Sequence, residues 1–227
     1  MAPSFAKPHL VELAGPPGAG KSTVFRSLLA RDQTIEGRPG LRTREYAGAF
    51  TREVLAVLGT LARERYRSRV TLEQVRMMAY LQALPRILER APSPDRRIIA
   101  FDQGPVYYLT RPTLTNERLA RWRRRVLHTW APLLDVVVWL DAPDAVLVER
   151  INSRDKWHRL KGGPEGRALE VLTESRAAYE TVLRELEMRR HGPAILRFDT
   201  SRRSADAIAH EVLAALHGKI TPMAQRA

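Results

Sequence analysis

The sequence has 227 residues, of which 44% are hydrophobic and 28% charged, and it contains no cysteine. This length fits one domain with a sizeable core, and the composition is typical of a globular protein rather than a fibrous or disordered one. The absence of cysteine excludes disulfides, thiolate nucleophiles and cysteine-bound metals, and it fits a cytoplasmic location. No apolar run reaches membrane-spanning length and no secretory signal pattern is present, so we expect no membrane partner.

The formal net charge of +13 favours polyanionic partners. The basic residues are mostly arginine and are spread over nearly every segment, as in Arg121 and Arg123 to Arg125 or the pair Arg189 and Arg190. We therefore interpret the charge as a solvated, arginine-rich surface, with a nucleic-acid partner as the less favoured alternative. The oligomeric state, a homodimer included, stays open.

Short apolar runs alternate with longer segments of helical period, which predicts a single α/β domain with a parallel sheet and helices on both faces. Strands are predicted at 9–14, within 34–43, at 97–102, 135–141 and 194–199. Helices are predicted at 21–31, 49–66, 71–91 with a kink at Pro85, 115–130, 144–151, 167–190 and 204–217. The domain would span 1–227, with its core at about 8–218.

The turn between the first strand and the first helix matches G-x-x-x-x-G-K-[ST], the Walker A phosphate loop. It reads Gly15, Pro16, Pro17, Gly18, Ala19, Gly20, Lys21 and Ser22, followed by Thr23. Glycines let backbone N–H groups approach phosphates closely, and the start of the helix adds a positive dipole end. Lys21 would bridge the outer phosphates and Ser22 would bind Mg²⁺. We therefore predict ATP and Mg²⁺ as cofactors.

The strand predicted at 97–102 ends in an acidic residue, Asp102. Asp102 would lie at the edge where open α/β sheets bind ligands. It is a candidate for the base that accepts a proton from an acceptor hydroxyl, for a Mg²⁺ ligand, or for both. The plain alternative is a turn residue before Gly104-Pro105.

Arginines follow the strand at 135–141 and its helix. Arg150 and Arg154 are candidate catalytic residues, with Arg159 beyond them, because cations that close over a transferring phosphoryl group stabilise its charge. Gly162-Gly163-Pro164 would hinge a lid at about 150–166. Ordinary cations at the end of a surface helix are the alternative.

The order of these parts resembles the nucleoside and nucleoside monophosphate kinases, and most closely their thymidylate kinase and deoxynucleoside kinase branch. The resemblance rests on the phosphate loop, Asp102, Leu140-Asp141-Ala142-Pro143, the arginine-bearing lid, the helix with Arg176 and Tyr179, and Phe198-Asp199-Thr200-Ser201. It implies a three-layer P-loop domain with about five parallel strands and a helical lid. It also implies that Thr200, Ser201 and Arg202 lie beside the adenine, that the lid arginines reach the ATP phosphates, and that helices at about 42–91 build the acceptor pocket.

The resemblance also suggests residues for that pocket: Arg42, Arg44, Tyr46, Arg76, Tyr80 and Gln82, with Gln103 beside Asp102. Members of the branch carry arginine where this chain has Gln103. Glutamine lacks the fixed charge and the fork that hold an acceptor's phosphate. We therefore predict transfer of the γ-phosphoryl group to a free hydroxyl on a nucleoside, a sugar or an antibiotic-like alcohol. A nucleoside monophosphate kinase, a polynucleotide 5′-hydroxyl kinase and a nucleotide-gated regulatory protein without substantial turnover stay open.

Overall fold

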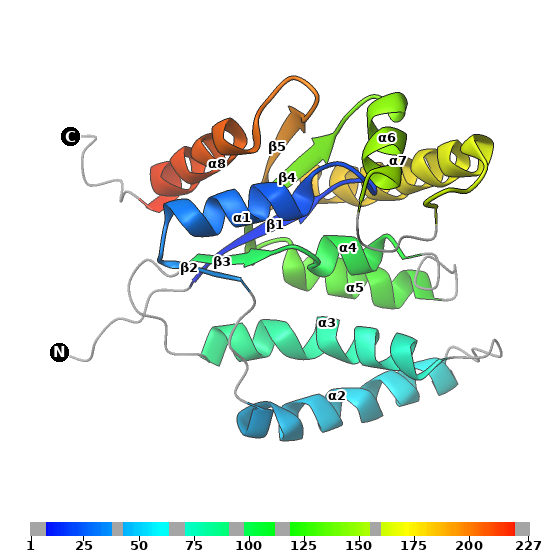
Figure 1. The fold of residues 1–227 in the computed structure, drawn as a ribbon. Helices are drawn as coiled ribbons and strands as arrows, with labels where there is room; N and C mark the ends of the chain where they lie inside the picture. Colours follow the sequence, from blue (N-terminus) through cyan, green and yellow to red (C-terminus); the bar gives the residue numbers. More distant parts are fainter. Residues whose placement is uncertain are drawn as a thin grey trace.

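Five parallel strands form one sheet with helices on both faces (Figure 1). The structure is a computed structural model, and it describes residues 8–37, 43–63, 71–90, 98–111, 119–154 and 160–220. The strands are β1 (His9–Ala14), β2 (Ile35–Gly37), β3 (Ile98–Phe101), β4 (Leu134–Asp141) and β5 (Ala194–Asp199). They lie in the order β2-β3-β1-β4-β5. This architecture confirms the predicted fold class.

The central strand β1 places the predicted phosphate loop. β1 pairs with β3 on one side and with β4 on the other. The chain runs from β1 toward β2 and from β4 toward β5, so the connections after these two neighbouring strands lead in opposite directions. That reversal is the switch point at which open α/β sheets bind ligands, outside the carboxyl ends of the strands. The carboxyl ends of β1, β3 and β4 therefore meet at one edge.

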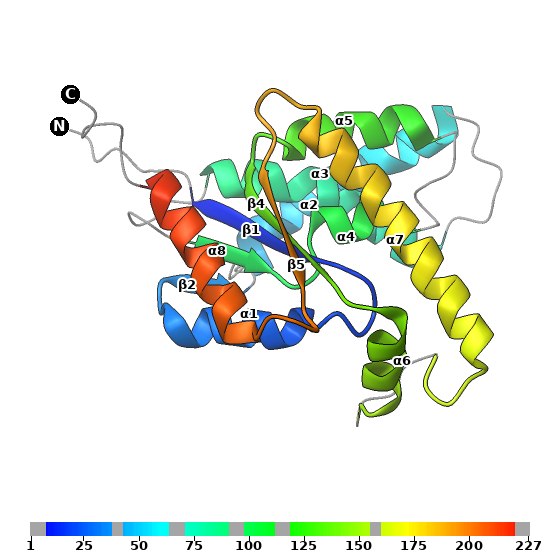
Figure 2. The same ribbon diagram turned by 90° about the horizontal axis from the view of Figure 1, so that it is seen from above.

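The helices divide between the two faces of the sheet (Figures 1 and 2). One face is covered by α1 (Lys21–Arg31), α6 (Asp144–Asn152) and α8 (Ala205–Ile220). The other is covered by α2 (Thr43–Arg63), α3 (Leu72–Arg90), α4 (Pro105–Leu109), α5 (Ala120–Trp130) and α7 (Glu165–Glu187). The α2–α3 pair lies furthest from the sheet. None of the described helices is long and apolar enough to cross a membrane.

Several predicted helix limits are wrong by a few residues. α2 begins at Thr43 rather than at residue 49, and α7 ends at Glu187 rather than at 190. The last turn of α7 gives way to a tight turn in which the Gly192 N–H donates to the Arg189 carbonyl. α4 was not predicted, because five residues are too few to show a helical period. α3 continues through Pro85.

Candidate active site

The phosphate loop packs so closely against its neighbours that two of its glycines cannot carry a side chain. Gly15 and Gly18 have φ angles of 149° and 85°. A Cβ atom on Gly15 would lie 2.2 Å from the Leu140 carbonyl oxygen, and one on Gly18 would lie 2.7 Å from that of Leu147. The loop is therefore held against the end of β4 and against α6 by contacts that only glycine allows.

The start of α1 offers an unneutralised positive dipole end to this loop. The first hydrogen bonds of the helix run from the N–H groups of Thr23 and Val24 to the Gly20 carbonyl, at 2.9 and 3.0 Å. The N–H groups of Lys21 and Ser22 precede these bonds and lack an intrahelical acceptor. The first turn contains no acidic residue. The arrangement suits an anion such as a phosphate.

Lys21 folds back over the loop. Its Nζ donates hydrogen bonds to the carbonyl oxygens of Gly15 and Pro16, at 2.6 and 2.9 Å. Burial lowers the pKa of Lys21 to about 8; the negative charge of Asp102 opposes this shift, and the positive charge of Arg154 adds to it. The ammonium group therefore stays mostly protonated at neutral pH. The charges of Asp102 and Arg154 are therefore near enough to Lys21 to influence it.

The residues predicted to hold Mg²⁺ lie together. The Ser22 hydroxyl donates to Asp102 Oδ2 at 3.4 Å, which joins the start of α1 to the end of β3. A hydroxyl and a carboxylate beside a phosphate loop supply only oxygen donors, the ligands that Mg²⁺ prefers. The pair therefore fits a magnesium ion.

A cavity of about 430 Å³ opens beside the residue that follows Asp102. Its lining residues are Phe50, Leu72, Glu73, Arg76, Met77, Tyr80, Gln103, Tyr107, Tyr108 and Arg111. Three predicted acceptor residues, Arg76, Tyr80 and Gln103, are among them. Arg42 and the side chains of Arg44 and Tyr46 lie outside the described part of the structure.

Gln82 was placed wrongly with these residues. It lines a separate hollow of about 500 Å³ with Arg52, Glu53 and Arg86. Gln82 is two positions after Tyr80, and an advance of two positions turns an α-helix by about 200°. The two side chains therefore leave α3 on nearly opposite faces.

The cavity has an aromatic wall and a charged rim. The Tyr108 ring meets the rings of Tyr80 and Tyr107 edge to face, with centroids 5.6 and 5.4 Å apart. The Arg111 guanidinium lies 5.6 Å from the Tyr107 ring centroid, donates to its hydroxyl at 3.2 Å, and pairs with Glu73 at 3.8 Å. Such a wall suits a flat or apolar molecular body with polar groups at its edge.

Glu12 is a site residue that sequence reasoning missed. Its side chain, on β1, is fully buried and faces α4. Oε1 accepts hydrogen bonds from the N–H groups of Gly104 at 3.1 Å and Tyr107 at 2.8 Å, and Oε2 accepts one from Val106 at 2.9 Å. Since Pro105 has no N–H, Glu12 satisfies every backbone donor of residues 104–107. An acidic residue amid an apolar strand was the signal that could have revealed it.

Glu12 thereby braces the segment that links Asp102 to the cavity. A Cβ atom on Gly104 would lie 2.7 Å from the Glu12 carboxyl, so only glycine fits there. The braced segment carries Tyr107 and Tyr108 into the cavity wall. Burial raises the pKa of Glu12 to about 8, although the three N–H donors act in the opposite direction.

The predicted adenine-side residues form the turn after β5. Arg150 donates from Nη1 to Thr200 Oγ1 at 2.8 Å and from Nη2 to the Thr200 carbonyl at 2.9 Å. Arg150 therefore joins α6 to this turn rather than to the phosphate loop. The N–H and hydroxyl of Ser201 donate to Asp199 Oδ1 at 2.8 and 2.6 Å, and Arg202 pairs with Asp199 at 3.4 Å. Arg159 and the rest of 155–159 in the predicted lid lie outside the described residues.

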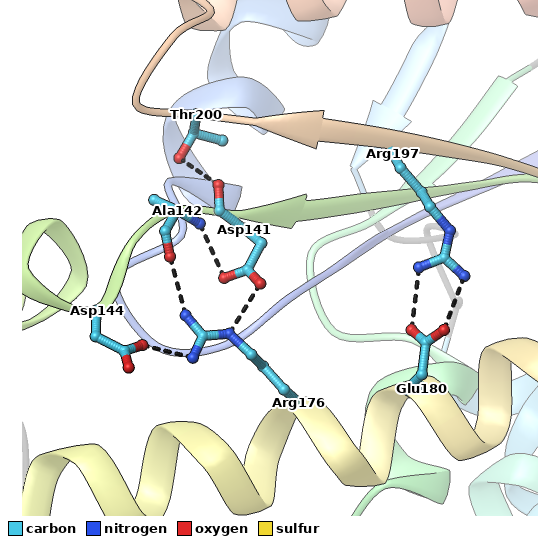
Figure 3. A network of polar contacts seen from close by, with 7 residues as sticks. All are labelled: Asp141, Ala142, Asp144, Arg176, Glu180, Arg197 and Thr200. Carbon is cyan, nitrogen blue, oxygen red and sulfur yellow. Dashed lines mark hydrogen bonds and ion pairs between the residues drawn. The ribbon is translucent and has the colours of Figure 1, made fainter.

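Arg176 joins three elements at the end of β4 (Figure 3). From α7, its Nε donates to Asp141 Oδ2 at 2.8 Å and its Nη2 to the Ala142 carbonyl at 2.9 Å, while Nη1 donates to Asp144. The Asp141 carbonyl in turn accepts from the Thr200 N–H at 2.8 Å. One guanidinium thus holds α7, the end of β4 and the start of α6 in a fixed relation.

Comparison with solved structures places this geometry in a known fold. The protein YorR from Bacillus subtilis, in complex with phosphorylated GDP, has a TM-score of 0.53 and 17% identity, over 92% of this chain and 96% of that one. A deoxyadenosine kinase from M. mycoides with bound dCTP has a TM-score of 0.51 and 15% identity, over 92% and 99%. No protein-family model and no curated protein matches the sequence. The chain therefore has the fold of the P-loop kinases.

Proposed function

We propose that the chain is a kinase that transfers the γ-phosphoryl group of ATP to a hydroxyl group of a small molecule. One observation carries this proposal: the acidic end of β3 stands between an anion-binding loop and an aromatic cavity. Asp102 accepts a hydrogen bond from Ser22, and the next residue, Gln103, lines the cavity. A phosphate donor in the loop and an acceptor in the cavity would meet at Asp102.

The residues at this junction supply the groups that phosphoryl transfer needs. The N–H groups at the start of α1 and the Lys21 ammonium would hold the phosphates. Ser22 and Asp102 would hold Mg²⁺, which when bound neutralises charge on phosphate oxygens. Asp102 would also accept the proton of the attacking hydroxyl. Arg154, whose charge acts on Lys21, would offset charge that develops on the transferring group.

The nucleotide base would lie on the other side of the loop. Arg150 and Thr200 form a hydrogen-bonded wall there, with Ser201 and Arg202 in the same turn. The resemblance to the thymidylate kinase and deoxynucleoside kinase branch supports this assignment, as does the shared fold. In this arrangement the base and the acceptor occupy separate sides of the phosphate loop.

Mass spectrometry can test the proposal directly. The protein would be incubated with MgATP and a panel of nucleosides, nucleoside monophosphates, sugars and aminoglycoside-like alcohols, and we expect one class to gain a phosphoryl group. Asp102→Asn should lower kcat by about 10²- to 10⁴-fold while changing MgATP affinity little. Asp206→Asn, an exposed change on α8, is the control. A normal rate in Asp102→Asn would refute the base assignment, and absence of saturable MgATP binding would refute the whole proposal.

A nucleoside monophosphate kinase is the second candidate, because the cavity contains Arg111, a cation that the sequence did not place there, in addition to the predicted Arg76. Arg111 and Arg76 both line it, although Arg111 is partly neutralised by Glu73. Arginine is suited to bidentate binding of an acceptor's phosphate. If this candidate is correct, the panel will show transfer to monophosphates, and Arg76→Gln will raise KM for them. Transfer to free nucleosides or sugars instead, with KM unaffected by Arg76→Gln, would exclude it.

A further inference from the structure

The outward face of α5 carries a row of basic residues that the proposed reaction does not use. Its inward face is apolar, with Trp122, Val126 and Trp130 buried. Its exposed face carries Arg121, Arg124, Arg125 and His128. These four positions follow the i, i+3, i+4, i+7 spacing of one helical face, and they extend over about 10 Å. The helix contains no acidic residue.

Two further arginines join this row in space. A groove of about 580 Å³ is lined by Arg63, Arg121, Arg124, Arg125, His128 and Arg189, and we call it the arginine groove. Arg63 ends α2, and Arg189 lies in the turn after α7. Within the described ranges, every lining residue is basic. Arg189 Nη1 lies within hydrogen-bond distance of His128 Nδ1, at 3.2 Å, which joins the turn after α7 to α5.

Several arginines elsewhere on the molecule are paired with carboxylates. Arg197 is bound by Glu180 at 3.0 Å (Figure 3), and Arg167 is bound by Glu170 at 3.1 Å. By contrast, Arg124 and Arg125 form no ion pair with any carboxylate in the part of the chain that the structure describes. A bound anion would supply the negative charge that these two guanidinium groups lack.

We propose that the arginine groove binds the phosphate backbone of a single-stranded nucleic acid. Guanidinium forks match the paired oxygens of a phosphodiester. The row on α5 is about 10 Å long, which is long enough to contact more than one phosphate of a strand. Among the residues that the structure describes, no aromatic side chain lines the groove to stack on bases, so we expect the contacts to be with the backbone and independent of sequence.

This binding is independent of phosphoryl transfer and can be measured without an acceptor. The probe is a fluorescently labelled oligothymidylate, titrated by anisotropy at several salt concentrations. Each phosphate contact of a single strand contributes about 0.7 to the slope of log K against log salt. The double variant Arg124→Glu/Arg125→Glu should therefore lower the slope by about 1.4 and weaken binding by about tenfold or more.

A control variant distinguishes the effect of the groove on binding from the effect of the net charge. Arg167→Glu/Arg184→Glu makes the same change in net charge at exposed, carboxylate-paired arginines of α7. We expect it to bind oligothymidylate within about twofold of wild type, and both variants to bind MgATP as wild type does. Equal weakening in the two variants would overturn the proposal, as would no saturable binding to the oligonucleotide. Binding only to vesicles of anionic phospholipid would also overturn it, in favour of a membrane surface.

Discussion

Replacing Glu12 with glutamine tests how a buried carboxyl group supports the site. Burial raises the pKa of Glu12 from 4.5 to about 8, so the folded protein keeps a proton there that the unfolded chain loses. The folded state binds more protons over this interval, and its free energy of unfolding must therefore fall as the pH rises through it. About 3.5 pH units at about 1.4 kcal/mol each give a loss of at most about 5 kcal/mol.

Glutamine does not titrate, so the Glu12→Gln variant lacks this pH dependence. The difference in free energy of unfolding between wild type and the variant therefore follows the ionisation of Glu12 and not that of other groups. Its amide NH₂ would face backbone donors, which should cost about 1–3 kcal/mol. Wild type should therefore be the more stable protein near pH 5, and the order should reverse near pH 8. Urea unfolding at steps across this range, with equal m-values required, measures the difference.

An exposed change provides the control for this comparison. Glu170→Gln on α7, where the side chain is 65% exposed, should differ from wild type by a small and nearly constant amount. A stability difference between wild type and Glu12→Gln that stays flat or grows with pH would refute the reasoning. In that case the three N–H donors would lower the pKa of Glu12 by more than burial raises it, and Glu12 would accept their hydrogen bonds as a carboxylate anion.

Three further outcomes are expected. Gly15→Ala should weaken MgATP binding by about tenfold or more, because the new Cβ atom would lie 2.2 Å from the Leu140 carbonyl oxygen. Calorimetry measures this affinity, and an unchanged value would contradict the described loop geometry. Arg176→Lys should lower stability by about 1–3 kcal/mol, since lysine cannot span Asp141 and its other acceptors, and thermal unfolding would show whether it does. The pKa of Lys21, lowered to about 8, predicts that MgATP affinity falls as the pH rises above about 8; calorimetry of Lys21→Ala should show no such fall.

The sequence alone was sufficient to predict the limits of the elements that have a strong local pattern. The limits of β1, α1 and β5 coincide with the predicted ones, because each is an apolar run or a helical period bounded by glycine, proline or a charged residue. The phosphate loop was recognisable because glycine and lysine must stand at fixed spacings to bind phosphate. Even the proximity of Ser22 and Asp102 followed from a local rule, since the carboxyl ends of neighbouring parallel strands share an edge.

Tertiary structure decided which distant side chains share a space. Glu12 and Val106 are 94 positions apart, and nothing local to either shows that they form a hydrogen bond. The arginine groove likewise brings Arg63, Arg125 and Arg189 together from two helices and the turn after a third, where the sequence indicated only dispersed charge. Periodicity reports how the backbone repeats, but the packing of whole elements sets how each helix is rotated and what it contacts. The chain's own pattern thus determined the fold and the loop, whereas packing determined the cavity wall, the brace and the groove.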